Sequence, residues 1–196
     1  MEIYKTIILA IAAYFIGSIS FSYIFAKKHT GKDIRNLKVK NAGAFNVFLS
    51  VGPVFGISVG LLDASKTLLI VLLAQVWGLD IVHSIAAASF GIIGHCFPVY
   101  YNFHGGKGAG PVVGIFLYFI PIEFLICLIP AAIIAFLIHR PGTTPIFFIL
   151  FSPLAAYISN KELVLVNSLI YLALLTAVLN AIILLTKRNR NVVEQK

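Results

Sequence analysis

The chain has 196 residues, of which 60% are hydrophobic and 11% charged, and its mean hydropathy is +0.98. A soluble domain of this length needs more polar residues for its surface, so the composition excludes that class and predicts one polytopic membrane domain over residues 1–196. The net charge of +8 is interpreted by its position along the chain, and nucleic acid is not an expected partner.

The apolar segments predict an all-α integral membrane protein with about seven crossings, some of them short. The segment over residues 41–60 is interrupted by four glycines and Pro53, which is typical of a short or re-entrant helix. No secretory signal peptide is expected, because the first segment continues to Lys27 without a small-residue cleavage site. In chain order, the predicted crossings cover residues 4–26, 61–77, 81–100, 109–120, 124–138, 145–158 and 163–185.

The distribution of charge predicts an outer N-terminus and a cytoplasmic C-terminus. Residues 27–40 carry six Lys or Arg against the single acid Asp33, so this loop is placed in the cytoplasm. Of the 15 Lys and Arg, 12 fall in predicted inner segments, since Lys5, Lys161 and the intramembrane Lys66 are the exceptions. The inner segments include the turn at 139–142 and the tail Lys187-Arg188-Asn189-Arg190.

Residues 94–114 contain the clearest candidate for a binding site. Gly105, Gly106 and Gly108 surround Lys107 immediately before the next apolar segment. A flexible backbone with free N–H groups, a cation and a following helix N-terminus suit an anion such as phosphate. The spacing is not that of a P-loop. Lys107 is therefore predicted to bind an anion, and the preceding His104 is expected to be a solvated basic residue.

Other polar residues near the cytoplasmic face allow two interpretations each. Asp63 and Lys66, one helical turn apart, form either a structural ion pair or a site in which Lys66 holds an anionic group. Asn41 and Asn46 either hydrogen-bond a phosphate or carbonyl, or cap the next helix. His95 is either catalytic or a hydrogen-bonding residue at a helix end. Cys96 and Cys127 lie in different apolar segments and indicate neither a disulfide nor a metal site.

In order and spacing, four segments resemble the bacterial PlsY-type family of integral-membrane acyl-phosphate:glycerol-3-phosphate acyltransferases, over nearly the whole chain. They are Gly17-Ser18-Ile19 with Phe21 and Lys27; Asp33-Ile34-Arg35 followed by Asn41, Gly43, Ala44 and Asn46; Asp63-x-x-Lys66; and Gly94-His95-x-Phe97-Pro98 followed by Phe103-x-Gly105-Gly106-Lys107-Gly108.

The resemblance implies a seven-helix enzyme of phospholipid synthesis in the bacterial plasma membrane, with its active site on the cytoplasmic side. It would transfer a fatty acyl group from acyl phosphate to the 1-hydroxyl of glycerol 3-phosphate, without acyl-CoA, a metal or another cofactor. The products would be lysophosphatidic acid and phosphate. Membrane lipid is an implied partner, and a protein partner stays open. The implied catalytic residues are His95, Asn41 and Asn46, and the implied phosphate- or substrate-binding residues are Lys107, Gly105, Gly106, Gly108, Lys66, Lys40 and Arg35.

The chain also departs from the family's motifs. Where the first motif reads Ser-Gly-Asn-x-Gly-Ala-Thr-Asn-x-x-Arg, the serine, glycine, threonine and arginine are replaced by Val39, Lys40, Phe45 and Leu49. Elsewhere Thr67 replaces a glycine, Ala109-Gly110-Pro111 replaces Val-Ala-Thr, and Lys187-Arg188-Asn189-Arg190 replaces His-Arg-x-Asn.

Loss of charge-assisted donors from a phosphate site weakens binding, although Lys40 can restore one charge locally. The alternatives are therefore a paralogue with a different acceptor, or a non-catalytic membrane protein that binds lipid or a partner. A small-solute transporter is disfavoured, because no inverted repeat or pair of broken helices is evident.

Overall fold

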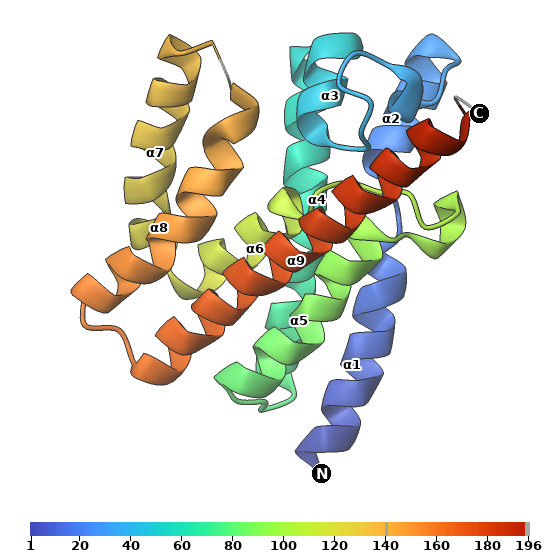
Figure 1. Ribbon diagram of the computed structural model, residues 1–196. Coiled ribbons are helices and arrows are strands. Elements are labelled where there is room, and N and C mark those ends of the chain that lie inside the picture. Colours follow the sequence, from blue (N-terminus) through green and yellow to red (C-terminus); the bar gives the residue numbers. More distant parts are fainter. Residues whose placement is uncertain (140, 195–196) are drawn as a thin grey trace.

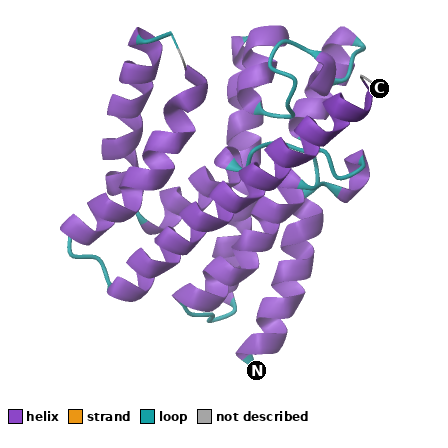
Figure 2. Ribbon diagram, in the orientation of Figure 1, coloured by secondary structure: helices purple, strands orange, loops and turns teal. Residues whose placement is uncertain are grey.

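The computed structural model describes residues 1–139 and 141–194, and every regular element in these ranges is a helix (Figure 1, Figure 2). The protein is an all-helical, multi-pass membrane protein, as predicted, whereas the number and direction of the crossings stay predictions. Segments long and apolar enough to cross a membrane are Glu2–Thr30, Pro53–Val76, Ile81–Tyr101 and Leu163–Thr186, and Ala109–Phe119, Pro121–Leu137 and Thr144–Ile158 are shorter apolar helices.

The first predicted crossing, residues 4–26, lies within Glu2–Thr30, a segment long and apolar enough to cross a membrane, but this segment is not one continuous helix. It is divided into α1 (Glu2–Gly17) and α2 (Phe21–Thr30). The Ser18 hydroxyl donates to the carbonyl oxygen of Tyr14 at 2.8 Å, and the Ser20 hydroxyl caps α2 by accepting from the N–H of Tyr23 at 3.3 Å. Serine side chains that bond to nearby backbone compete with the helix, so the chain turns here and exposes backbone carbonyl groups to other helices.

The predicted division between residues 41–60 and 61–77 is wrong. After the short helix η1 (Ile34–Asn36) comes the helix α3 (Ala44–Ser50), and α4 (Pro53–Val76) then continues without a break through Gly56 and Gly60. Proline at the first position starts α4, because its missing N–H would be unpaired there in any case. At Gly56 a side chain would collide with the backbone of Phe48 in α3. This glycine lets α3 pack closely on α4.

The second half of the chain ends in α9 (Leu163–Glu194), which crosses α5 and extends toward α2 and the C-terminus (Figure 1). It follows α5 (Ile81–Cys96), η2 (Val99–Tyr101), α6 (Ala109–Phe119), α7 (Pro121–Leu137), η3 (Pro141–Thr143) and α8 (Thr144–Ile158). The last helix thus continues beyond residue 185, where the predicted crossing ends. The predicted inner-turn residue Arg140 and the side chains of the tail Lys187-Arg188-Asn189-Arg190 lie outside the described residues.

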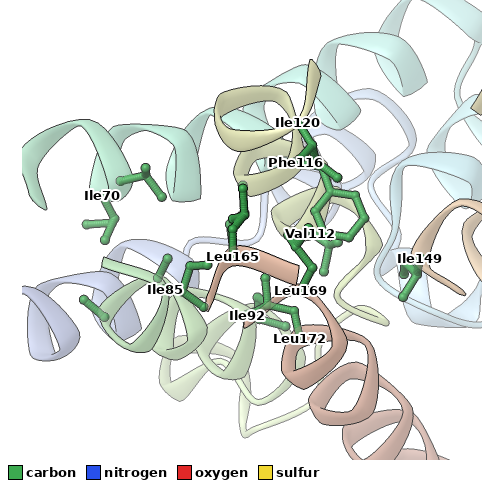
Figure 3. Close-up of a cluster of buried hydrophobic side chains, with 14 of the residues drawn as sticks. Ile70, Ile85, Ile92, Val112, Phe116, Ile120, Ile149, Leu165, Leu169 and Leu172 are labelled. Carbon is green, nitrogen blue, oxygen red and sulfur yellow. The ribbon is translucent and has the colours of Figure 1, made fainter. Parts of the chain in front are cut away.

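A buried apolar cluster connects α4, α5, α6 and α9. Its members include Ile70, Ile85, Phe116 and Leu169, each exposed by 2% or less. Figure 3 shows part of this cluster, in which Ile85 and Ile92 of α5 lie among leucines of α9. Many large apolar side chains on the outer faces of the helices are exposed, as expected of helices that face lipid tails.

Small residues allow α1 and α5 to approach each other closely. A side chain at Gly17 would overlap the backbone of Gly91, and one at Gly94 would overlap the carbonyl oxygen of Tyr14. Gly17 therefore permits the close packing of α1 on α5. Helix interfaces in membranes depend on such contacts, because burial away from water contributes little there.

Replacing Gly94 with alanine is expected to destabilise the protein, because the added Cβ would overlap backbone atoms of α1. Overpacking of this kind costs about 1–3 kcal/mol, which corresponds to a loss of several degrees in melting temperature. The matched control is Gly60→Ala, where the added Cβ would make an ordinary contact 3.6 Å from Ala44. Thermal unfolding in detergent checks this, and equal melting temperatures for the two variants would contradict it.

Candidate active site

A pocket of about 660 Å³ lies where η1 and the segment after it meet residues 96–105 and the C-terminal half of α9. Its charged side chains are mainly basic, and several asparagines lie among them. The lining residues are Asp33, Arg35, Asn36, Lys40, Asn41, Cys96, Phe97, Asn102, Phe103, His104, Gly105, Ile183 and Thr186. Cations and amide groups with a few apolar side chains suit an anionic ligand that also carries hydroxyl groups.

Arg35 connects two walls of the pocket. Its Nε and Nη2 donate to the Asp33 carboxylate at distances between 2.5 and 3.0 Å, and its Nη1 donates to the carbonyl oxygen of Tyr101 at 3.0 Å. Partial burial raises the pKa of Asp33, but hydrogen bonds from Arg35 and its positive charge outweigh this, so the carboxyl pKa lies below its usual value. Asp33 therefore stays ionised and holds Arg35 at the pocket wall.

The two predicted asparagines have different environments. Asn46 is fully buried, and its amide donates to the carbonyl oxygens of Ile34 and Asn41 at 2.7 and 2.9 Å. Its oxygen accepts from the N–H of Val39 and from the Ser50 hydroxyl, both at 3.1 Å. The amide of Asn46 is thus used to hold the segment before α3, and its catalytic contact stays a prediction.

Asn41 lines the pocket itself. Its side-chain oxygen is buried and has no hydrogen-bond partner among the described residues. Buried polar atoms in proteins are almost always paired, so an acceptor of this kind is suited to a donor from a ligand or a bound water. Asn41 remains a candidate for contact with substrate.

Lys66 is buried in α4 and surrounded by acceptors. Its ammonium lies 2.7 Å from the carboxylate of Asp63 and donates to the backbone carbonyls of Gly17 and Ile19, at the break between α1 and α2. An ammonium has three N–H donors, and these three partners use them all. The predicted ion pair is confirmed. The phosphate contact expected of Lys66 stays a prediction, since its donors point into the protein and Lys66 does not line the pocket.

His95, at the end of α5, lies between this ion pair and the glycine loop. Its Nδ1 is 3.6 Å from Oδ1 of Asp63, and the ring is 8% exposed. A side chain at Gly106 would overlap Nε2 of His95, so the other ring edge faces the loop. His95 does not line the pocket, although the next two residues do. Its geometry indicates a role in positioning the loop.

The glycine loop is anchored by its own backbone. The N–H of Gly105 donates to the carbonyl oxygen of Cys96 at 3.1 Å, and that of Gly106 donates to the carbonyl oxygen of His95 at 3.0 Å. The expectation of free N–H groups is therefore wrong at both glycines. Gly108, with φ +83°, caps α6, whose first N–H groups remain at the helix N-terminus. Lys107 is exposed beside this N-terminus, outside the residues that line the pocket.

Thr67 and Pro111, two positions at which the chain departs from the family motifs, are hydrogen-bonded to each other. The Thr67 hydroxyl donates to the carbonyl oxygen of Pro111 at 2.5 Å, so a side chain of α4 holds the first turn of α6. At Gly114 a side chain would overlap the backbone of Ala64, which explains how the two helices come so close. The family motif has a threonine hydroxyl at position 111, where this chain has proline. In this chain a hydroxyl is present instead on the facing helix, at Thr67.

Sequence reasoning missed several residues of the site. Asn36, Asn102 and two residues of α9, Ile183 and Thr186, line the pocket. Asn180 of α9 donates to the carbonyl oxygen of Lys107 at 3.0 Å and so connects the last helix to the glycine loop. The sequence did carry one signal: Asn180 is a polar residue inside the predicted crossing 163–185, and polar residues in such segments usually face a polar partner.

Among the described residues, one cluster could hold a metal ion, and it lies at the starts of α1 and α5, at the end of the molecule away from α2 and α3 (Figure 1). Ligand atoms of Glu2, Asp80 and His83 lie within 4.8 Å of one another. Oδ1 of Asp80 already interacts with both the backbone N–H and Nδ1 of His83 at 2.8 Å. These contacts are those of an N-cap on α5, which accounts for the cluster.

The stabilising effect of the Asp33–Arg35 pair is expected to depend on pH. The folded pKa of Asp33 is lowered, so its contribution is present above the unfolded pKa and is lost as pH falls through the folded pKa. At neutral pH, Asp33→Asn should unfold more easily than the wild type, and the difference should shrink in acid. Urea unfolding at a series of pH values measures it, and a difference that grows toward low pH would overturn the assignment.

Replacing one partner of the Asp63–Lys66 pair is expected to lower the stability of the protein more than replacing both. Lys66→Met leaves a buried carboxylate with a lost partner, which costs roughly 3–5 kcal/mol. The double variant Asp63→Leu/Lys66→Met removes both charges and should be more stable than Lys66→Met alone. Thermal unfolding in detergent compares them, and a double variant less stable than the single one would show that the ion pair is not the stabilising unit.

The known proteins that are similar to this chain agree with the resemblance shown by its motifs. A family profile described as glycerol-3-phosphate acyltransferase matches residues 7–194. A glycerol-3-phosphate acyltransferase of Ehrlichia ruminantium (strain Gardel) is 40% identical over 134 residues, which is 68% of each chain. Glycerol-3-phosphate acyltransferase 5 of Dehalococcoides mccartyi is 37% identical over 122 residues, 62% of this chain and 52% of that protein. The chain thus spans about half to two thirds of the length of these curated relatives.

The fold is similar to that of PlsY (YgiH), an integral membrane glycerol 3-phosphate acyltransferase. Its glycerol 3-phosphate form superposes with a TM-score of 0.80 at 26% identity and covers 94% of both chains. Its lysophosphatidic acid form, at 24% identity, gives a TM-score of 0.78 and supports the fold alone. Since the profile match extends over nearly the whole chain, the resemblance inferred from the motifs is confirmed, and this chain belongs to the glycerol-3-phosphate acyltransferase family.

Proposed function

We propose that this protein is an acyltransferase of bacterial phospholipid synthesis that transfers a fatty acyl group from acyl phosphate to glycerol 3-phosphate, giving lysophosphatidic acid and phosphate. Family membership and the similarity to the glycerol 3-phosphate form of PlsY support this reaction. The observation that carries it is the basic pocket with the unpaired Asn41 oxygen in its wall. The site would lie at the cytoplasmic face of the inner membrane, beside the lysine-rich end of α2.

The chemistry needs little from the protein beyond positioning and charge. The acceptor hydroxyl oxygen forms a bond to the acyl carbon, and the bond from that carbon to the phosphate oxygen breaks. The hydroxyl proton passes to the released phosphate, so the reaction balances without a metal or another cofactor. Holding the two substrates together and stabilising negative charge can then supply much of the rate.

Each residue near the pocket has a role in this proposal. Arg35 and Lys107 provide positive charge for the phosphate groups, together with the N-terminus of α6. Asn41 accepts a hydrogen bond from the acceptor hydroxyl and orients it. Asn46 and His95 act as positioning residues, since each holds a segment of the pocket wall through the contacts described above.

The departures from the family's first motif affect the pocket less than the sequence implies. Val39, Phe45 and Leu49 are not among its lining residues, whereas Lys40 is. The replaced hydroxyl and arginine positions thus lie outside the wall, and the wall retains cations and amides. This arrangement favours the acyltransferase over a non-catalytic paralogue.

Purified protein in lipid, supplied with acyl phosphate and glycerol 3-phosphate, should release phosphate and form lysophosphatidic acid. Asn41→Ala should lower kcat by about tenfold or more, because the hydroxyl loses an orienting acceptor. Asn167→Ala is the matched control, since Asn167 is exposed near the start of α9 and does not line the pocket. Absence of lysophosphatidic acid would overturn the proposal, and turnover with another acceptor alone would identify a paralogue of different specificity.

A further inference from the structure

One face of α9 carries polar residues that contact the glycine loop. Thr176 and Asn180 lie one helical turn apart, and Ile183 and Thr186 continue this face to the pocket wall. Thr176 is buried, and its methyl group would lie 3.7 Å from a Cβ placed at Gly108. Polar residues in an apolar helix long enough to cross a membrane usually face a polar partner. Here the partner is the backbone of the loop.

Asn180 holds the middle of this loop. Its Nδ2 donates to the carbonyl oxygen of Lys107 at 3.0 Å and to that of Thr176, in its own helix, at 2.8 Å. A side-chain amide has two N–H donors, and these two carbonyls use both of them. The bond to Thr176 fixes the amide on α9, so the bond to Lys107 fixes the loop relative to α9.

The contact with Asn180 determines the direction of the peptide group between Lys107 and Gly108. This peptide is trans, so its N–H points opposite to the Lys107 carbonyl and therefore away from Asn180. Gly108 has φ +83°, and because glycine tolerates both signs of φ, rotation of this peptide costs little free energy. Asn180 thus selects one of the orientations that glycine allows.

The selected orientation belongs to a group of three successive N–H donors. Gly108 is left-handed and Ala109 begins α6, and successive residues of left- and right-handed conformation form a concave group of N–H donors. Within the described residues, the N–H groups of Gly108, Ala109 and Gly110 donate to no other group. The next residue, Pro111, has no N–H. These three donors are the part of the loop that is available to a negative charge.

Other helices hold the two ends of the same segment. Carbonyl oxygens of α5 accept the N–H groups of Gly105 and Gly106, and Thr67 of α4 donates to the carbonyl oxygen of Pro111. The Lys107–Gly108 peptide lies between these contacts and is anchored by Asn180. Preorganised donors stabilise a charge well because they do not rearrange when it develops, so their direction has to be fixed beforehand.

We propose that Asn180 is a positioning residue for the transfer reaction. Its amide holds the Lys107–Gly108 peptide so that the N–H groups of residues 108–110 face the negative charge that develops on the reacting acyl phosphate. The nature of this charge rests on the proposed function, whereas the orientation of the peptide by Asn180 does not. Loss of the amide therefore affects the rate of transfer more than the binding of the acceptor.

Asn180→Leu removes both donors, keeps the size of the side chain and suits an apolar helix. Its kcat should fall about 10- to 100-fold, because the peptide is free to rotate, and its KM for glycerol 3-phosphate should stay within about twofold. Asn180→Gln keeps an amide and should retain more of the wild-type kcat. The matched control is Asn167→Leu, the same change at an exposed asparagine of α9 that does not line the pocket, with kinetics like the wild type.

A kcat of Asn180→Leu within about threefold of the wild type would overturn the positioning role, since misplaced catalytic groups have larger effects. A kcat of Asn180→Gln no higher than that of Asn180→Leu would overturn the role of the amide. An unchanged kcat with a KM for glycerol 3-phosphate about tenfold higher would assign Asn180 to acceptor binding instead, which also contradicts the inference.

If the wild type shows no turnover, the proposed function fails, and the loop is then tested by the thermal shift on adding inorganic phosphate. The wild type and Asn167→Leu should be stabilised more than Asn180→Leu, because in the last of these the N–H groups of residues 108–110 no longer share one direction. Equal shifts in the three proteins, or none, would overturn the inference.

Discussion

A buried ammonium inside an apolar helix is the constraint on which the rest of this structure depends. Lys66 is 4% exposed, and an unpaired charge at such a position would be very unfavourable. Asp63 supplies one partner, but an ammonium has further donors to satisfy. Backbone carbonyls at the break between α1 and α2 satisfy them, so the break and the buried lysine require each other.

The same polar network extends from the ion pair toward the pocket. Asp63 also faces Nδ1 of His95, and the carbonyl oxygen of His95 accepts the N–H of Gly106 in the glycine loop. Gly110, near the start of α6, passes so close to Asp63 that a side chain there would lie 2.7 Å from its Cβ. A buried charge pair thus positions a loop at one end of the molecule, through contacts between adjacent groups.

The pocket combines a rigid wall with groups that are suited to a ligand. Asn46 and Arg35 donate to neighbouring backbone and side-chain oxygens, and they hold the segment before α3 and the segment after α5 in place. Asn41 has an unpaired acceptor, and Lys40 has a strained backbone. Preorganised polar groups of this kind are effective because they need not rearrange when charge develops on a substrate.

Hydropathy, motif order and an i, i+3 spacing are local along the chain, so the membrane class, the helical fold, the family and the Asp63–Lys66 pair were all predictable from it. The turn within the first apolar segment was not predicted and the division before α4 was misplaced, since hydropathy does not reveal that Ser18 and Ser20 bond to backbone or that Gly56 serves packing.

Which polar residues reach the pocket depends on the tertiary structure. Lys66 and Asn46 have the residue types of ligand-binding groups, yet other protein groups use their donors, and for Lys66 two of these groups come from the end of α1 and the turn after it. Lys40, Asn102 and Thr186 come from three different parts of the chain and share one wall. Whether a polar side chain is free for a substrate depends on which groups folding places beside it, and spacing along the chain does not contain that information.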